Sequence, residues 1–140
     1  MSSVRAAILF AVEAFYQAFN DRDFAAMAAL WDEDGPVSCI HPGWHPLSGR
    51  QEVLATWKAI LGNAESPTAE MVAAKVQVLS PDVALVVGFE RIGNQHLAVT
   101  NTLVRRNGRW LVAHHQAGPL AMQPEFEEEG EEPAAGPTLN

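Results

Sequence analysis

A change in the spacing of apolar residues near residue 65 limits the fold more than any other feature of this chain. Before it, apolar side chains recur every three or four residues in three segments, as they do on one face of an α-helix. We therefore expect helices at about residues 3–19, 24–31 and 48–61. Their apolar positions are Val4, Ile8, Val12, Phe15 and Phe19, then Phe24, Met27, Leu30 and Trp31, then Val53, Leu54, Trp57, Ile60 and Leu61.

Polar residues indicate where two of these helices begin. Asp21 or Asp23 can cap the second helix, because a carboxylate accepts the free N–H groups of a first turn. Ser48 with Gln51 three residues later fits a capping box for the third helix. Both helices are therefore expected to start close to these residues.

After residue 67 the sequence becomes β-prone. Four stretches are rich in Val or Thr or alternate between apolar and polar residues, at about residues 70–79, 83–92, 96–105 and 109–117. Short turn sequences separate them, and Asn107-Gly108 suits a tight hairpin. A shorter β-prone stretch covers residues 37–41. Three helices followed by consecutive hairpins predict an α+β fold with helices packed on a curved antiparallel sheet.

The charge of the chain is concentrated at its end. The net charge is −8, but six of the 17 acidic residues lie in residues 125–132, where no Lys or Arg occurs. The eleven acids and nine bases before Pro124 leave a net charge of −2. This nearly balanced body argues against nucleic-acid binding and membrane-surface binding. We expect one domain over residues 1–122 and an acidic, disordered and solubilising tail over residues 123–140.

The cysteine content and the first residues of the chain indicate its cellular compartment. Cys39 is the only cysteine, so an internal disulfide is excluded. The chain starts directly with a helical pattern, not with a signal sequence, and no apolar run is long enough to span a membrane. We expect a cytoplasmic protein whose partner is a small molecule or another subunit.

Residues 37–50 concentrate potential chemistry between two helical patterns. His41 and His45 titrate near neutral pH and could act as a general acid or base, or could instead hydrogen-bond backbone carbonyls of the proline-rich turn. Trp44 has no periodicity that ties it to a core, so it is a candidate for the lid of a ligand site. Trp57 on the third helix and Tyr16, the only tyrosine, are further candidates for ligand binding, with a core position as the alternative for Trp57.

Two polar residues in the strands are further candidates. Glu90 shares a strand face with Ala84 and Val86, where a carboxylate needs a partner or has a raised pKa, unless it reaches water at the strand end. Asn101 could offer amide hydrogen bonds to a ligand, or could satisfy backbone groups at a bulge.

His114 and His115 point to opposite faces of the last predicted strand. Alternation groups one of them with Trp110 and Val112 and the other with Leu111 and Ala113, but it does not identify the inner face.

A metal site is a further possibility that the sequence raises. His41, His45 and His115 could supply three nitrogen ligands. Their spacing is not that of a helix-borne ligand pair, so we expect neither a metal nor another cofactor.

Four motifs carry a resemblance to a known family. Residues 15–23, 29–31, 47–53 and 107–115 are similar to SnoaL-like and ketosteroid-isomerase-like proteins of the nuclear transport factor 2-like superfamily. The resemblance covers about residues 4–120 and implies a cone-shaped fold whose open end holds a small apolar ligand. It also implies homodimers that form through the outer face of the sheet, and it favours His115 as the pocket histidine.

The resemblance to ketosteroid isomerases breaks at two residues. Alignment on residues 20–23 places Phe15 where those enzymes have a tyrosine, and Cys39 near their aspartate base, which argues against steroid isomerisation. One hypothesis is a cofactor-free isomerase, cyclase or dehydratase acting on an apolar carbonyl or hydroxy compound. His41, Glu90 and His115 would transfer protons in it. The alternative is a non-catalytic ligand-binding or dimerisation domain.

Overall fold

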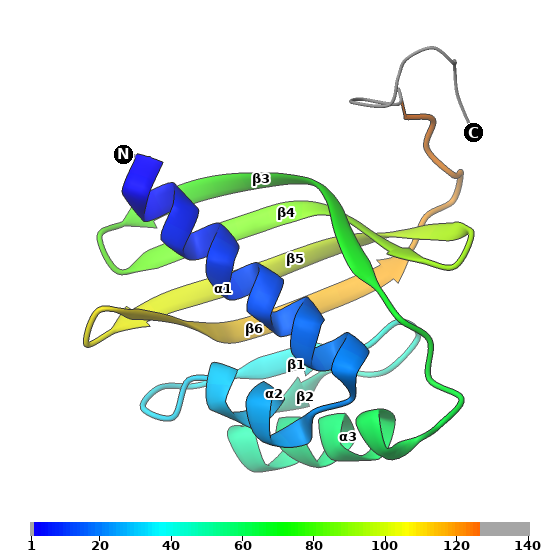
Figure 1. The fold of residues 1–140 in the computed structure, drawn as a ribbon, viewed down its shortest axis with the longest axis horizontal. Coiled ribbons are helices and arrows are strands. Elements are labelled where there is room, and N and C mark those ends of the chain that lie inside the picture. The colour runs from blue at the N-terminus through cyan, green and yellow to red at the C-terminus, as the bar shows by residue number, and fades with distance from the viewer. Residues whose placement is uncertain (1, 127–140) are drawn as a thin grey trace.

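Three helices pack against a six-stranded sheet in the computed structural model, which describes residues 2–126 (Figure 1). Helix α1 (Ser2–Asp21) crosses the face of the sheet, while α2 (Phe24–Leu30) and α3 (Arg50–Gly62) lie beside β1 (Ser38–Ile40) and β2 (Leu47–Ser48). The longer strands are β3 (Glu70–Ser80), β4 (Val83–Ile92), β5 (Gln95–Arg106) and β6 (Arg109–Pro119). The predicted helices and long strands are all present.

The sheet is mixed, with the strand order β2-β1-β6-β5-β4-β3. Strands β3 to β6 form the predicted antiparallel meander. One further pair is parallel, because β1, for which no pairing was predicted, lies beside β6 with Ser38 opposite His114. A crossover through α3 and the meander brings β6 back beside β1 in the same direction. Strand β2 was missed because two residues show no periodicity.

The capping prediction was correct for α2 and wrong for α3. The side chain of Asp23 accepts a hydrogen bond from the Ala26 N–H at 3.0 Å, as an N-cap does. Ser48 instead belongs to β2, where it pairs with Ser38. The residue before α3 is Gly49, and its φ of 93° is a conformation that glycine adopts at little energetic cost. Glycine has no side chain that could cap the helix. Pairing with β1 thus took precedence over a capping box.

A bulge in β3 curves the sheet. The register between β3 and β4 shifts between Val72 and Lys75, and Ala73 has a φ of 58°. Gly88 of β4 permits this, since a Cβ added there would lie 2.9 Å from the Val72 carbonyl oxygen and 3.0 Å from that of Ala73. Strand β3 therefore bends over the inner face of the sheet toward α1, as Figure 1 shows.

Buried apolar side chains form two clusters on the inner face. The larger joins α1, α3 and the sheet, with Phe15, Trp31 and Trp57 at its centre. The smaller contains Leu97, Val99 and Ala117, and Met71 and Ile92 pack against both clusters. No helix of residues 2–126 is long and apolar enough to cross a membrane.

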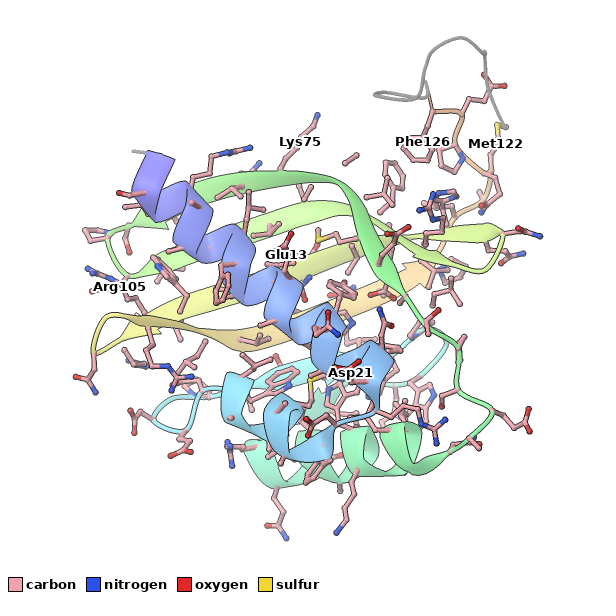
Figure 2. The ribbon with its side chains drawn as sticks, in the orientation of Figure 1. Glu13, Asp21, Lys75, Arg105, Met122 and Phe126 are labelled. Atoms are coloured by element: carbon pink, nitrogen blue, oxygen red, sulfur yellow. The ribbon has the colours of Figure 1, made fainter. Side chains whose placement is uncertain are left out.

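The first residues of the predicted acidic tail contact the sheet. The Gln123 side chain makes two hydrogen bonds with the His96 backbone, at 2.8 and 3.1 Å. The Phe126 ring lies 5.0 Å from that of Phe89, near the β4–β5 hairpin (Figure 2). The rest of the predicted tail, residues 127–140, lies outside the described residues.

Candidate functional site

Tyr16 and Glu90 meet in the interior between α1 and the sheet. Tyr16 lies on the buried side of α1, and Glu90 lies on the inner face of β4 with only 2% of its surface exposed. The Tyr16 hydroxyl donates a hydrogen bond of 2.7 Å to Glu90 Oε2. The partner that the sequence required for a buried carboxylate is therefore a phenol 74 residues away.

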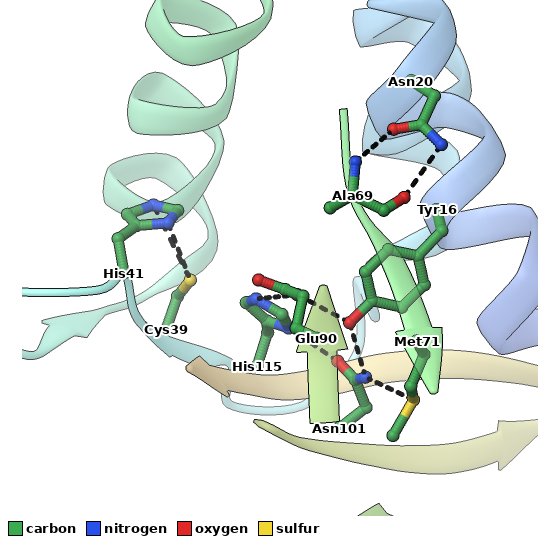
Figure 3. A network of polar contacts seen from close by, with 9 residues as sticks. All are labelled: Tyr16, Asn20, Cys39, His41, Ala69, Met71, Glu90, Asn101 and His115. Carbon is green, nitrogen blue, oxygen red and sulfur yellow. Dashed lines mark hydrogen bonds and ion pairs between the residues drawn. The ribbon is translucent and has the colours of Figure 1, made fainter. Parts of the chain in front are cut away.

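Asn101 and His115 extend this network across neighbouring strands. They pair directly between β5 and β6, and His115 Nδ1 lies 2.7 Å from Asn101 Oδ1 (Figure 3). The Asn101 amide nitrogen is directed to the Tyr16 hydroxyl at 3.5 Å and to Met71 Sδ at 3.8 Å. With the amide in this orientation Oδ1 accepts, so Nδ1 of His115 carries the proton. His115 Nε2 then has a free lone pair and lies 3.8 Å from Glu90 Oε2.

A second bulge decides which histidine points inward. The register of β5 and β6 shifts so that Thr102 pairs with His114 while Leu103 pairs with Val112, which leaves Ala113 as an extra residue. Strict alternation would have grouped His114 with Trp110 and Val112. The bulge instead places His115 on their face, where it is 1% exposed. His114 lies on the outer face, where Ser38 Oγ approaches its Nδ1 at 2.6 Å.

Burial makes the groups of this network prefer their neutral forms. It raises the pKa of Glu90, although the hydrogen bond from Tyr16 acts in the opposite direction. It also lowers the pKa of His115 to about 3, with smaller contributions from His41 and His114. Burial and the neighbouring Glu90 charge raise the pKa of Tyr16 well above its usual value. The site thus combines a carboxyl whose pKa is raised with an imidazole whose pKa is lowered, and both shifts favour the neutral forms.

His41 is also buried, and its ring contacts that of Trp57. Thr56 donates its single hydroxyl proton to the Val53 carbonyl at 2.7 Å, so its oxygen accepts from His41 Nε2–H at 2.9 Å. Nδ1 of His41 is therefore the unprotonated nitrogen. Burial lowers the pKa of His41 to about 4.

Cys39 lies beside His41, at 3.7 to 3.8 Å from the imidazole nitrogens. Burial, followed by the charge of Glu90, raises the pKa of this thiol to about 12. Cys39 is therefore a neutral thiol at ordinary pH.

Trp57 joins the two buried histidines. Its ring centroid lies 4.9 Å from that of His41 and 5.9 Å from that of His115. Phe15 packs edge-on against Trp57, and its ring centroid lies 4.9 Å from that of His115. The aromatic rings therefore fix the orientation of both imidazoles.

The two other loop candidates lie outside the buried network. Trp44 is 47% exposed and contacts His41 with ring centroids 5.3 Å apart. His45 is exposed and stacks on Trp44. No group of three or more His, Cys, Asp or Glu side chains within residues 2–126 is arranged to hold a metal ion.

Sequence reasoning did not identify Thr56 and Met71 as parts of the site. Thr56 sets the tautomer of His41, and Met71 contacts the amide of Asn101. No local signal marks either residue, because each acquires its role only when α3 or β3 packs against the sheet.

Comparisons with known proteins agree with this architecture. The SnoaL-like domain family profile matches residues 8–122. A protein of the NTF2-like family from Streptomyces avermitilis, described as a candidate dehydratase, is 31% identical. The match covers 86% of this chain and 99% of that one, with a TM-score of 0.78. The predicted cone-shaped α+β fold is thereby confirmed.

Two further relatives differ in their described roles. A candidate calcium/calmodulin-dependent protein kinase type II association domain from Thiobacillus denitrificans is 33% identical, with a TM-score of 0.66 and coverage of 79% of this chain and 92% of that one. The F-box protein SKIP8 of Arabidopsis thaliana is 27% identical over 108 residues, or 76% of this chain. The chain spans 46% of the length of that plant protein.

Proposed function

This chain belongs to the SnoaL-like domain family, and we propose that it is a cofactor-independent dehydratase acting on a small, apolar hydroxy carbonyl compound. The observation that carries the proposal is the buried pair of Glu90 and His115, with Oε2 and Nε2 3.8 Å apart. Elimination of water needs a base for one proton and an acid for the leaving hydroxyl. This pair offers both on one side of a bound molecule.

The hydrogen bonds around the pair suit the charges that the reaction would produce. Neutral His115 takes the proton from the carbon next to the carbonyl, and the electrons of that C–H bond form the carbon–carbon double bond. Protonated Glu90 gives its proton to the departing hydroxyl, which leaves as water. Tyr16 O–H then stabilises the Glu90 carboxylate, and Asn101 Oδ1 stabilises the His115 imidazolium.

The starting state returns by one proton transfer from His115 Nε2 to Glu90 Oε2. Both groups act from the same side of the substrate, so the elimination is expected to be syn. His41 and Trp57 would line the ligand, with Trp44 and His45 at the rim. The relation to the Streptomyces avermitilis protein supports dehydration over isomerisation or cyclisation.

The test is an absorbance assay. The β-hydroxy ketone formed from benzaldehyde and acetone is offered as substrate, because its dehydration gives a conjugated enone that absorbs in the near ultraviolet. Glu90→Gln and His115→Gln should each lower kcat at least about 100-fold, the range for a lost general acid or base. His114→Gln, one residue along on the outer face, is the matched control and should retain activity.

A second candidate function rests on the relation to the association domain from Thiobacillus denitrificans. Under this alternative, the fold would bind a ligand or another subunit without catalysing a reaction. Saturable binding of the hydroxy ketone, with no enone formed by the wild-type protein, would favour this alternative over dehydration.

A further inference from the structure

The indole of Trp57 carries a buried donor that the fold leaves without a partner. Its side chain is 1% exposed, and Nε1–H makes no hydrogen bond to the described residues. A buried polar group without a partner is costly, so such a group in a site points to a missing ligand atom.

The surroundings of this N–H lack a good acceptor. The indole interacts with the thiol of Cys39, and this contact lowers the pKa of the thiol by less than burial or the Glu90 charge raises it. A neutral thiol is a poor hydrogen-bond acceptor, whereas a carbonyl oxygen is a strong one. The rings of His41 and His115 both contact this indole, so an oxygen bound to Nε1–H would lie close to the proposed base.

The remaining walls of the site disfavour a charged ligand. Its polar side chains are Tyr16, Cys39, His41, Glu90, Asn101 and His115, and none of them is Lys or Arg. Burial favours the neutral forms of His41 and His115. The apolar side chains that share the buried cluster with Trp57 include Phe15 and Phe19. A carboxylate or phosphate would therefore lose its hydration without gaining a cation.

We propose that Trp57 Nε1–H donates a hydrogen bond to the carbonyl oxygen of the ligand, so that the substrates are uncharged β-hydroxy ketones or aldehydes and not hydroxy acids. This inference rests on the proposed function for the identity of the reacting carbons. During proton removal by His115, the same N–H stabilises the negative charge that develops on the carbonyl oxygen.

The inference is tested by ligand binding with unreactive probes. Benzylacetone has the ketone but no hydroxyl, butylbenzene lacks the ketone oxygen, and hydrocinnamate replaces the methyl ketone with a carboxylate. Titration calorimetry of the full chain should show benzylacetone binding about tenfold or more tighter than either other probe, since a donor built for a ligand oxygen rejects analogues that lack it.

Trp57→Phe removes the donor and keeps most of the ring. In this variant, the preference for benzylacetone over butylbenzene should fall to within about twofold. Trp31→Phe is the matched control, because Trp31 also has a buried Nε1–H without a partner among the described residues but follows α2, where its backbone pairs with Val112. It should keep the preference.

A second measurement covers the case in which Trp57→Phe does not fold. Benzylacetone should shift the indole N–H resonance of Trp57 in the NMR spectrum of the wild-type protein, and butylbenzene should not. An unshifted resonance, a preference that persists in Trp57→Phe, equal binding of hydrocinnamate, or no binding of benzylacetone would each overturn the inference. A carbonyl preference that depends on Trp57, without any dehydration, would reject only the proposed function.

Discussion

Burial gives single ionisable residues of this protein properties that they do not have in water. Glu90, His41 and His115 have ordinary pKa values when exposed, but each is shifted toward its neutral form on the inner face of the sheet. The hydrogen bond from Tyr16 is the one contact that favours the charged form of Glu90. The pH dependence of the site is therefore set by the burial and the hydrogen bonds of these individual residues.

Tyr16→Phe tests this assignment. In the proposed dehydration Glu90 acts in its protonated form, so activity should be lost as the pH rises through the raised pKa of this carboxyl. The Tyr16 hydrogen bond lowers that pKa, and its removal should move the alkaline limb of kcat/KM to higher pH. A limb displaced to lower pH would contradict the assignment, and His114→Gln should leave the limb in place.

Two bulges determine how whole strands present their side chains. The bulge at Ala113 turns His115 inward, and the bulge at Ala73 bends β3 over Gly88. Each inserts one residue, but each changes the face or the position of many residues that follow. At the element scale, the site depends on irregular backbone more than on strand length.

Gly88→Ala should destabilise the fold, because the added methyl group would meet the backbone oxygens of Val72 and Ala73. We expect a loss of about 1–3 kcal/mol in the free energy of unfolding, the usual cost of overpacking, measured by urea denaturation. Gly118→Ala is the control, since a Cβ at Gly118 would meet nothing within 4 Å. Equal stabilities of the two variants would show that β3 does not press on Gly88.

Protonation of the buried histidines is coupled to the folding of the whole molecule. His41 has a pKa of about 4 in the folded protein against 6.5 in an unperturbed histidine, so the unfolded chain binds the proton first as the pH falls. Stability that His41 provides is thus present above pH 6.5 and is lost toward pH 4. His115 acts in the same direction, and Glu90, whose pKa is raised, acts in the opposite one.

Comparison with His41→Gln isolates this contribution. Between pH 6.5 and pH 4, the wild-type protein should lose up to about 1.4 kcal/mol of unfolding free energy per pH unit more than the variant. The measurement is urea denaturation at a series of pH values. Parallel curves for the two proteins would mean that His41 titrates normally in the folded state.

The outer face of the sheet is the surface through which we expect the chain to form dimers. A groove of about 630 Å³ lies there, with Val87, Phe89, Ala98 and Thr100 among its lining residues. We predict that a second copy of the chain covers this face. Val87→Arg should then convert dimers into monomers in analytical ultracentrifugation, whereas Gln17→Arg on the exposed side of α1 should not. A wild-type protein that is monomeric at micromolar concentration would contradict the prediction.

Local patterns in the sequence were enough for the order and type of the main elements. Helical and strand periodicities, the Asp23 cap and the Asn107-Gly108 hairpin each depend on residues close together in the chain. The preference for His115 as the pocket histidine came from family resemblance and not from alternation, and the structure places His115 on the inner face of the sheet. Strand β2 was not predicted and the start of α3 was predicted wrongly, because both depend on pairing with β1.

The sequence by itself determined which segments are helices and strands, since periodicity is a property of neighbouring residues. Only the tertiary structure decided the site. Tyr16 and Glu90 are 74 residues apart, Asn101 and His115 meet through strand register, and Trp57 reaches both histidines from α3. Contacts of this kind depend on bulges, burial and helix packing across the whole chain, which no short stretch of sequence specifies.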